Sequence, residues 1–343
     1  MNAIDIEKII AESEEELSAQ FKALEKIAYS NQCRVMEAFQ KSKIALRHFA
    51  ASSGYGYGDE GRDALNALFA DIFGAEAALV SPNILSGTHA LTVGLFGLLR
   101  TGDTLFSVSG NPYDTLQEVI GGKDIGSLAD FGISFKKCEL KNGDFDTDAI
   151  LEGLSDRTVK VVFIQRSRGY EWRDALSEEK IRKICSFVRS CGFTGCIFVD
   201  NCYGEFVETS EPTQNGADIC VGSLIKNPGG GIAPTGGYIV GKREYVDKIA
   251  GRLTAPSIGA EVGSYAYGYQ YFYEGVFLAP HVVCQALKGG LLIGACLEKL
   301  GFESSPSVKS LPYDITRAIR LIQGRSLSRL YRRCRRLRRS TVL

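Results

Sequence analysis

The chain has 343 residues, of which 45% are hydrophobic, and its 40 basic and 40 acidic side chains cancel in formal net charge. This length and apolar content are sufficient for a large buried core, which excludes an intrinsically disordered chain. The charges are unevenly distributed, because residues 325–343 contain eight Arg and no acidic residue, so the rest of the chain carries a net charge of −8. The sequence therefore predicts a globular, acidic body followed by a basic tail.

Cysteine use and the apolar segments bear on the compartment of the protein. The ten Cys form no Cys-x-x-Cys pair and have no His partner at metal-ligand spacing, which favours reduced thiols in a cytoplasmic protein without a metal site. The first 17 residues are dense in acids and lack the apolar run of a secretory signal. Residues 281–300 are apolar but contain two Lys and a Glu, which predicts a buried helix rather than a membrane span.

Along the chain, residues 4–50 show helical periodicity, a Gly-rich break follows, and a second helix is predicted over 63–73. We interpret residues 1–60 as an N-terminal helical arm. Beyond it, helical stretches such as 178–191 alternate with short apolar runs at 77–80, 104–108, 159–165, 195–200, 217–223 and 236–241. This alternation predicts a mainly parallel sheet in an α/β domain over 61–255, with a further C-terminal portion over 256–343.

In open α/β sheets, ligands bind at the carboxyl ends of the strands, so polar residues that follow the apolar runs are candidate site residues. Taken singly, each has an ordinary structural explanation, because such residues often cap helices, form turns or remain solvated. Four places qualify, namely Asp200 at the end of 195–200, Ser223 and Lys226 after 217–223, the run Ser86, Gly87, Thr88 and His89 at a predicted helix start, and Tyr113.

Together these residues fit the chemistry of pyridoxal 5′-phosphate (PLP). This cofactor needs a Lys amine for a Schiff base, here Lys226, and a carboxylate that keeps its pyridine nitrogen protonated, here Asp200. Backbone N–H groups at a helix start, with Ser223, would bind its phosphate. An aromatic ring would stack on the pyridine. The run Asn-Pro-Gly-Gly-Gly after Lys226 predicts room for close approach of the cofactor.

The motifs occur in a specific order: Ser-Gly-Thr (86–88), Gly-Asp (102–103), Tyr113, Val-Asp-Asn (199–201) and Ser-x-x-Lys (223–226). This order resembles the Cys/Met-metabolism branch of fold-type I PLP enzymes. The phrases YGYGDEGRDALN, SPNILSGTHAL, IQRSRGYEWR, VDNCYGEFVE and SLIKNPGGGIAPTGGYIVG resemble the methionine gamma-lyase-like family often labelled as aluminium-resistance proteins. The resemblance covers roughly residues 5–320. It implies a fold-type I, three-layer α/β/α large domain and a PLP-dependent carbon–sulfur lyase acting on a sulfur amino acid.

The resemblance also implies roles for single residues. Lys226 would form the Schiff base and move the α-proton of the substrate, and Asp200 would pair with the pyridinium nitrogen. Tyr203 would hydrogen-bond the O3′ atom of the cofactor, with core packing as the alternative. Two residues compete for the stacking role, Tyr113 and His89, and Tyr113 is preferred.

The residues that a second subunit would contribute, and those that would bind the substrate, are less defined. In the resembled branch a Tyr and an Arg of the neighbouring subunit reach the phosphate, so Tyr57 or Tyr55 and Arg62 are candidates and a homodimer or homotetramer is implied. The family's relatives have Tyr-x-Arg, whereas Arg62 lies five residues after Tyr57, so the pair stays open. Arg166 and Arg168 would hold a substrate carboxylate, or would simply be surface charge.

The C-terminal region departs from the family. Its members continue well beyond residue 343, and the Arg-rich tail from about residue 325 does not resemble their continuation, which predicts an incomplete C-terminal small domain and a non-native tail. A nucleic-acid-binding arm is the less favoured interpretation, because the acidic body has no second basic patch. Other PLP chemistry, such as an aminotransferase or an aldolase, and a truncated non-catalytic remnant of the fold remain alternatives.

Overall fold

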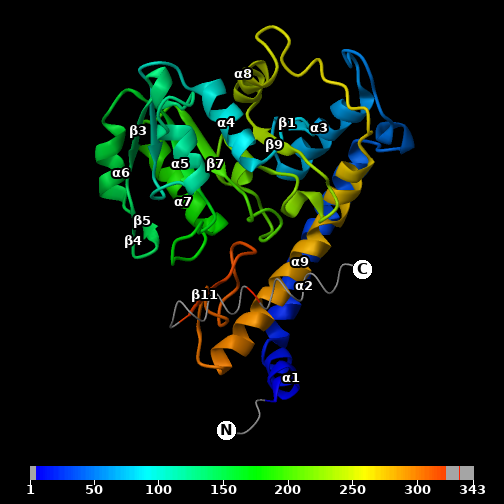
Figure 1. The fold of residues 1–343 in the computed structure, drawn as a ribbon, viewed down its shortest axis with the longest axis vertical. Helices are drawn as coiled ribbons and strands as arrows, with labels where there is room; N and C mark the ends of the chain where they lie inside the picture. The colour runs from blue at the N-terminus through cyan, green and yellow to red at the C-terminus, as the bar shows by residue number, and fades with distance from the viewer. Residues whose placement is uncertain (1–4, 322–331, 333–343) are drawn as a thin grey trace.

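The computed structural model describes residues 5–321 and Arg332, so the predictions for the tail from about residue 325 lie outside the described residues. A seven-stranded sheet with the order β1-β9-β8-β7-β6-β2-β3 forms the centre of the molecule (Figure 1). Its strands are β1 (Ala77–Ser81), β2 (Thr104–Ser107), β3 (Ser134–Lys137), β6 (Val159–Gln165), β7 (Cys196–Asp200), β8 (Ile219–Ser223) and β9 (Gly237–Gly241).

The sheet is mainly parallel, as the sequence predicts. Strands β3, β2, β6, β7 and β8 pair in parallel, whereas β9 is antiparallel to both of its neighbours, β1 and β8. Every residue of β7, β8 and β9 is buried, because helices cover both faces of the sheet. The carboxyl ends of β7 and β8 therefore open at the same edge, where Asp200 and Ser223 terminate their strands.

The sheet and the helices on its two faces form three layers. One face of the sheet packs against α4 (Gly87–Leu98), α5 (Asp114–Gly121) and α8 (Arg243–Leu253). The other face packs against α3 (Glu60–Phe73), α6 (Thr147–Leu154), α7 (Glu178–Ser190) and α9 (Gln270–Lys299). The α/β/α arrangement expected from the resemblance is confirmed.

The N-terminal helices lie along the longest helix. α1 (Ile6–Glu16) and α2 (Ser18–Lys41) run beside α9, and together they extend away from the sheet (Figure 1). Lys288 and Lys299 of α9 form ion pairs with Glu25 and Glu16 across this contact. By length and composition α9 would suffice to cross a membrane, but its buried residues form part of the core with α2 and α3.

α9 also supports the loop that carries Lys226. Within the short helical turn η4 (Asn227–Gly229) and just after it, Gly229 and Gly230 approach Gly275 of α9. A Cβ on Gly230 would lie 2.3 Å from the carbonyl oxygen of Gly275, and a Cβ on Gly275 would lie 2.5 Å from that of Gly229. Two members of this glycine run are therefore required for backbone packing against α9, and room for a cofactor beside the run stays a prediction.

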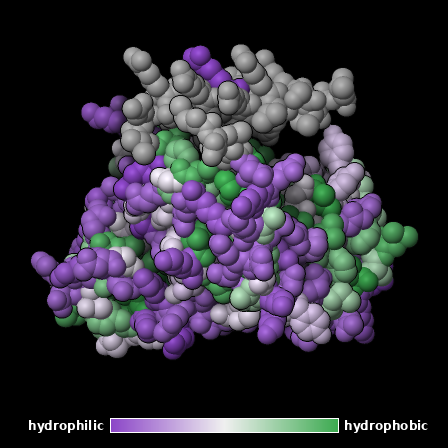
Figure 2. Space-filling model, turned by 90° about the horizontal axis from the view of Figure 1, so that it is seen from below, coloured by the Kyte–Doolittle hydropathy of each residue, from purple (hydrophilic) through white to green (hydrophobic). Residues whose placement is uncertain are grey.

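Beyond α9, β10 (Glu303–Ser305) and β11 (Ala318–Arg320) form a two-stranded antiparallel sheet that lies below the large domain (Figure 1). Another small sheet joins β4 (Leu140–Lys141) to β5 (Asp144–Phe145). Seen from below, the molecule presents mostly hydrophilic side chains, and its apolar side chains gather in separate patches (Figure 2). The remaining short helical turns are η1 (Leu46–Phe49), η2 (Ala129–Phe131) and η3 (Pro212–Asn215).

Candidate active site

A pocket of about 430 Å³ opens at the carboxyl ends of β7 and β8. This volume is in the range of small-molecule sites. It brings together predicted residues from four separate segments, namely Ser86, Gly87, Thr88, Tyr113, Asp200, Tyr203, Ser223 and Lys226. No cluster of three or more His, Cys, Asp or Glu positioned to hold a metal ion occurs in the described part of the chain.

The first turn of α4 forms one wall of this pocket. Ser86 is the N-cap, and its Oγ accepts from the N–H of His89 at 3.1 Å. This leaves the N–H groups of Gly87 and Thr88, which lie before the first intrahelical bonds, available to an anion. A Cβ on Gly87 would lie 3.0 Å from Cys202 Sγ, 3.4 Å from Ser223 Cβ and 3.9 Å from Lys226 Nζ. Any side chain here would therefore fill the space beside these N–H groups.

Replacing Gly87 by Ala is expected to weaken PLP binding by roughly tenfold or more, since the added methyl occupies this space (~1.4 kcal/mol per tenfold). Gly289→Ala is the matched control, because Gly289 also lies in a helix and a Cβ there meets no atom within 4 Å. Equilibrium titration of the purified variants with PLP, followed by absorbance, measures the effect. Equal affinities for the two variants would show that Gly87 does not border the cofactor.

Lys226 and Asp200 form the charged centre of the pocket. Asp200 is buried and its Oδ1 accepts from the N–H of Cys202 at 3.1 Å. Burial raises the pKa of Asp200, which the positive charge of Lys226 opposes. Burial alone would lower the pKa of Lys226. The neighbouring Cys202, Asp200 and Tyr203 have a larger, opposite effect, so the pKa is raised. The Lys226 ammonium also lies 3.9 Å from the ring centroid of Tyr203.

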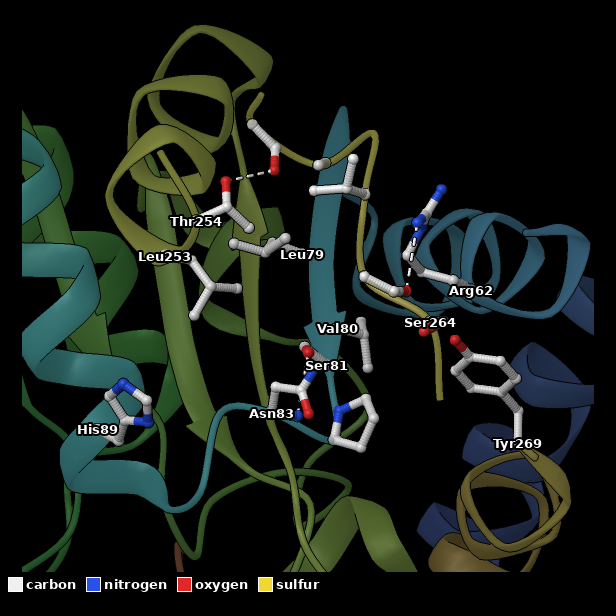
Figure 3. Close-up of a pocket in the computed structure, with 15 residues that line it drawn as sticks. Arg62, Leu79, Val80, Ser81, Asn83, His89, Leu253, Thr254, Ser264 and Tyr269 are labelled. Carbon is white, nitrogen blue, oxygen red and sulfur yellow. Dashed lines mark hydrogen bonds between the residues drawn. The ribbon is translucent and has the colours of Figure 1, made fainter. Parts of the chain in front are cut away.

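The structure separates the two candidates for the stacking role. Tyr113 lines the pocket, and its hydroxyl lies 2.8 Å from Thr88 Oγ1. His89 instead faces a second cavity of about 190 Å³, on the other side of the start of α4, together with Arg62 and Tyr269 (Figure 3). Its Nδ1 accepts from the N–H of Leu85 at 3.1 Å. Tyr113 is therefore placed with Lys226 and Asp200, whereas His89 is not.

Arg62 and Tyr57 lie outside this pocket. The Arg62 side chain is only 9% exposed and donates to the carbonyl oxygen of Gly56 at 2.9 Å and to that of Gly263 at 3.4 Å. Tyr57 and Tyr55 lie on the loop that Arg62 holds, and they are 67% and 79% exposed. Arg62 thus anchors the loop, and the two tyrosines are its accessible side chains.

Neither arginine predicted to hold substrate lines the pocket. Arg166 is fully buried, where it forms ion pairs of 2.7 Å with both Glu178 and Glu208 and donates to Asn201 at 2.8 Å. Arg168 is also buried, and it donates to the carbonyl oxygens of Glu171 and Ser305. These contacts occupy the Arg166 guanidinium with the protein itself, whereas Nη2 of Arg168 is buried without a hydrogen-bond partner.

Several pocket residues were missed in the sequence. Cys202 follows Asp200 and Asn201 in the turn after β7, and this position just beyond a strand could have identified it as a pocket residue. Tyr170 and Ile225 also line the pocket and are 88% and 52% exposed. Thr316 reaches the pocket from beyond α9, and no local pattern marks it.

A buried carboxyl group lies beneath the loop that carries Lys226. Glu205 is fully buried, its Oε1 accepts from the Tyr238 hydroxyl at 2.9 Å, and its backbone carbonyl accepts from the side chain of Asn227 at 3.0 Å. Burial raises the pKa of Glu205 from its usual 4.5 to about 8; the Tyr238 hydrogen bond and Lys226 oppose this rise, and Glu211 adds to it. The folded protein therefore holds this proton in conditions where the unfolded chain has lost it.

The raised pKa of Glu205 gives a pH dependence of stability. The stability that protonated Glu205 contributes is fully present below about pH 4.5. It is lost as the pH rises towards 8, because in that window the Glu205 carboxyl ionises freely only in the unfolded chain. Glu205→Gln cannot ionise and keeps an acceptor for Tyr238, so we expect it to reduce the fall in unfolding free energy over this window by about 2–4 kcal/mol. Urea denaturation at pH 5.5 and 8 measures this. An identical fall in wild type, Glu205→Gln and the surface control Glu152→Gln would refute it.

Similarity to known structures fits this geometry. The fold is that of fold-type I PLP-dependent enzymes, and it aligns with the PLP-dependent protein YhfS of Escherichia coli with a TM-score of 0.63 at 17% identity, covering 86% of this chain and 76% of YhfS. Residues 6–340 match the family model for methionine gamma-lyase. The chain therefore belongs to the methionine gamma-lyase family.

Two relatives are considerably more similar. Protein YnbB of Bacillus subtilis is 46% identical over 318 residues, which covers 92% of this chain and 75% of YnbB. A carbon–sulfur lyase involved in aluminium resistance from Clostridium novyi has a solved structure that aligns with a TM-score of 0.91 at 44% identity, covering 94% of this chain and 78% of that protein. The chain thus spans about three quarters of the length of these relatives.

Proposed function

We propose that the protein is a PLP-dependent carbon–sulfur lyase that acts on a sulfur amino acid by elimination, as a methionine gamma-lyase does. The observation that carries the proposal is the meeting of Lys226 and Asp200 with the open first turn of α4 in one pocket. The family and its aluminium-resistance relative support the reaction class.

The residues present fit this cofactor. Lys226 would hold it through its amine, Asp200 would face the pyridine nitrogen, and Tyr113 would stack on the ring. The N–H groups of Gly87 and Thr88, with the Ser223 hydroxyl, would bind the phosphate. When bound, PLP supplies an electron sink for negative charge at the α-carbon of the substrate.

The reaction also requires proton transfer by the chain itself. Lys226 Nζ would take the proton from the α-carbon of the substrate, for which the amine must be uncharged when the substrate is in place. Tyr203 and Asp200, which surround the ammonium in this structure, would keep Nζ at the pocket. The leaving thiol would receive a proton within the pocket, where the Tyr113 hydroxyl, which lies 2.8 Å from Thr88 Oγ1, is a candidate donor.

We also propose that the working form is a homodimer or a larger homo-oligomer. Tyr57 or Tyr55 of one copy would then reach the phosphate site of the other, which their exposure on a loop anchored by Arg62 supports. Arg62 would act through this loop rather than by touching the phosphate. A cytoplasmic location remains part of the proposal.

The test is product formation by the PLP-loaded protein. Methionine, cystathionine, homocysteine and cysteine are supplied in turn, and the keto acid is measured together with the released thiol or, from homocysteine and cysteine, hydrogen sulfide. Equimolar keto acid and released thiol or hydrogen sulfide from at least one substrate would support the proposal. Keto acid formed only with an added amino-group acceptor would indicate an aminotransferase, and no product from a PLP-loaded protein would favour a non-catalytic member of the fold.

A further inference from the structure

Two hydrogen bonds close the start of α4, and both involve His89. Ser86 is the N-cap, and its Oγ accepts from the backbone N–H of His89 at 3.1 Å. In the opposite direction, Nδ1 of the His89 ring accepts from the backbone N–H of Leu85 at 3.1 Å. This reciprocal pair resembles a capping box, in which the residue three positions after the N-cap returns a side-chain bond to the chain that enters the helix. His89 therefore ties that chain to the first helical turn.

Gly87 and Thr88 lie inside this tied turn and face the pocket of Lys226. Both residues line the pocket, and a Cβ on Gly87 would lie 3.9 Å from Lys226 Nζ. The hydroxyl of Thr88 lies 2.8 Å from that of Tyr113. Because the bonds at a helix start fix the conformation of its first residues, the turn over residues 85–89 sets where the N–H groups of Gly87 and Thr88 point.

The His89 side chain itself lies on the other side of the start of α4. It borders the cavity of about 190 Å³ that Arg62 and Tyr269 also line (Figure 3). The neighbouring Leu85 side chain is 68% exposed, so packing of that side chain does not hold the backbone at this point. The bond from the N–H of Leu85 to His89 Nδ1 is the contact that holds it.

We propose that His89 is a positioning residue, whose Nδ1 holds the turn over residues 85–89 so that the N–H groups of Gly87 and Thr88 point to the phosphate of the cofactor. His89 acts through the turn, and its acceptor atom rather than the flat face of its ring carries the effect. The inference rests on the proposed function, because it assumes that PLP binds beside Lys226 with its phosphate at the start of α4.

Two replacements of His89 separate its acceptor atom from its ring. His89→Asn keeps an acceptor bonded to Cγ, because Oδ1 takes the place of Nδ1, and it loses the ring. His89→Phe keeps a flat ring, for which the neighbouring cavity leaves room, and loses the acceptor. His281→Phe, the same change at an exposed His of α9, is the control. A role of the acceptor and a role of the ring therefore predict opposite orders of affinity for the two His89 variants.

Absorbance titrations of the purified proteins give their affinities for PLP and for pyridoxal, which lacks the phosphate. We expect His89→Phe to bind PLP about threefold to tenfold more weakly than wild type, the effect of one lost hydrogen bond, and His89→Asn and His281→Phe to stay within about twofold. Affinity for pyridoxal should be the same in all four proteins, because the misplaced N–H groups would have met only the phosphate.

Phosphorus NMR of the PLP-loaded proteins reports the surroundings of the phosphate directly. The chemical shift should change in His89→Phe and keep its wild-type value in His89→Asn. An unchanged PLP affinity in His89→Phe, or an equal loss for PLP and pyridoxal, would overturn the inference and leave the proposed function intact. Weaker PLP binding by His89→Asn than by His89→Phe would also overturn it, since the ring would then be the part that matters. A wild type that takes up no PLP would contradict the proposed function itself, and with it this inference.

Discussion

Replacing Lys226 by Ala is expected to lower the rate of elimination by about 10²- to 10⁴-fold, the range for loss of a positioned acid–base group. The structure gives the reason, because Lys226 Nζ lies against the Tyr203 ring, beside Gly87, in the pocket that Asp200 also lines. Among residues 5–321, Lys226 is the one Lys that lines this pocket. Steady-state kinetics with the best substrate from the amino-acid panel would measure the loss.

A control separates this loss from general damage. Lys123→Ala removes an exposed Lys far along the chain from the pocket residues and should retain wild-type kinetics. Because Lys226 is partly buried and interacts with Asp200, the unfolding free energy of both variants must also be measured. A folded Lys226→Ala variant with activity within tenfold of wild type would rule out Lys226 as the base.

Replacing Arg166 by Met is expected to destabilise the fold by about 3–5 kcal/mol, the cost of removing one partner of a buried ion pair. Arg166 is fully buried and its guanidinium is bound by Glu178 and Glu208, with Asn201 as a further acceptor. Without it, the two carboxylates remain close together with no cation between them. Because this network joins β6, α7 and the turn after β7, the loss would reach the strand that carries Asp200.

Urea denaturation of Arg166→Met measures this cost directly. Arg157→Met is the control, since Arg157 is exposed and its replacement should change the unfolding free energy by no more than about 0.5 kcal/mol. A loss in Arg166→Met as small as that of the control would mean that the ion pairs contribute nothing net. It would also reopen the possibility that Arg166 is available to a substrate.

The sheet and the centre of the site were predictable because their signals are local. The apolar runs ending at Asp200 and Ser223 are strands buried on both faces, and such strands read as continuous hydrophobic segments. Since parallel strands end at one edge, polar residues that follow them meet there, which brought Asp200 and Lys226 together from sequence alone.

Other features depend on contacts that span the sequence. His89 and Thr88 are adjacent on α4, yet the helix turns them towards different cavities, and only the packing of α4 decides which one faces the pocket of Lys226. In the sequence alone, Arg166 cannot be distinguished from a surface arginine, because its partners Glu178 and Glu208 come close to it only in the folded protein. Thr316 follows the pocket residues by 90 positions and a long helix, so nothing near it in the chain indicates its place.

The central claim is that Lys226 anchors PLP, and the most direct measurement is chemical trapping. The purified protein is incubated with PLP, reduced with borohydride, digested and analysed by peptide mass spectrometry. We predict a visible absorbance before reduction and a pyridoxyl group on the peptide that contains Lys226. A protein that takes up no PLP, or a pyridoxyl group attached only to other lysines, would contradict the account.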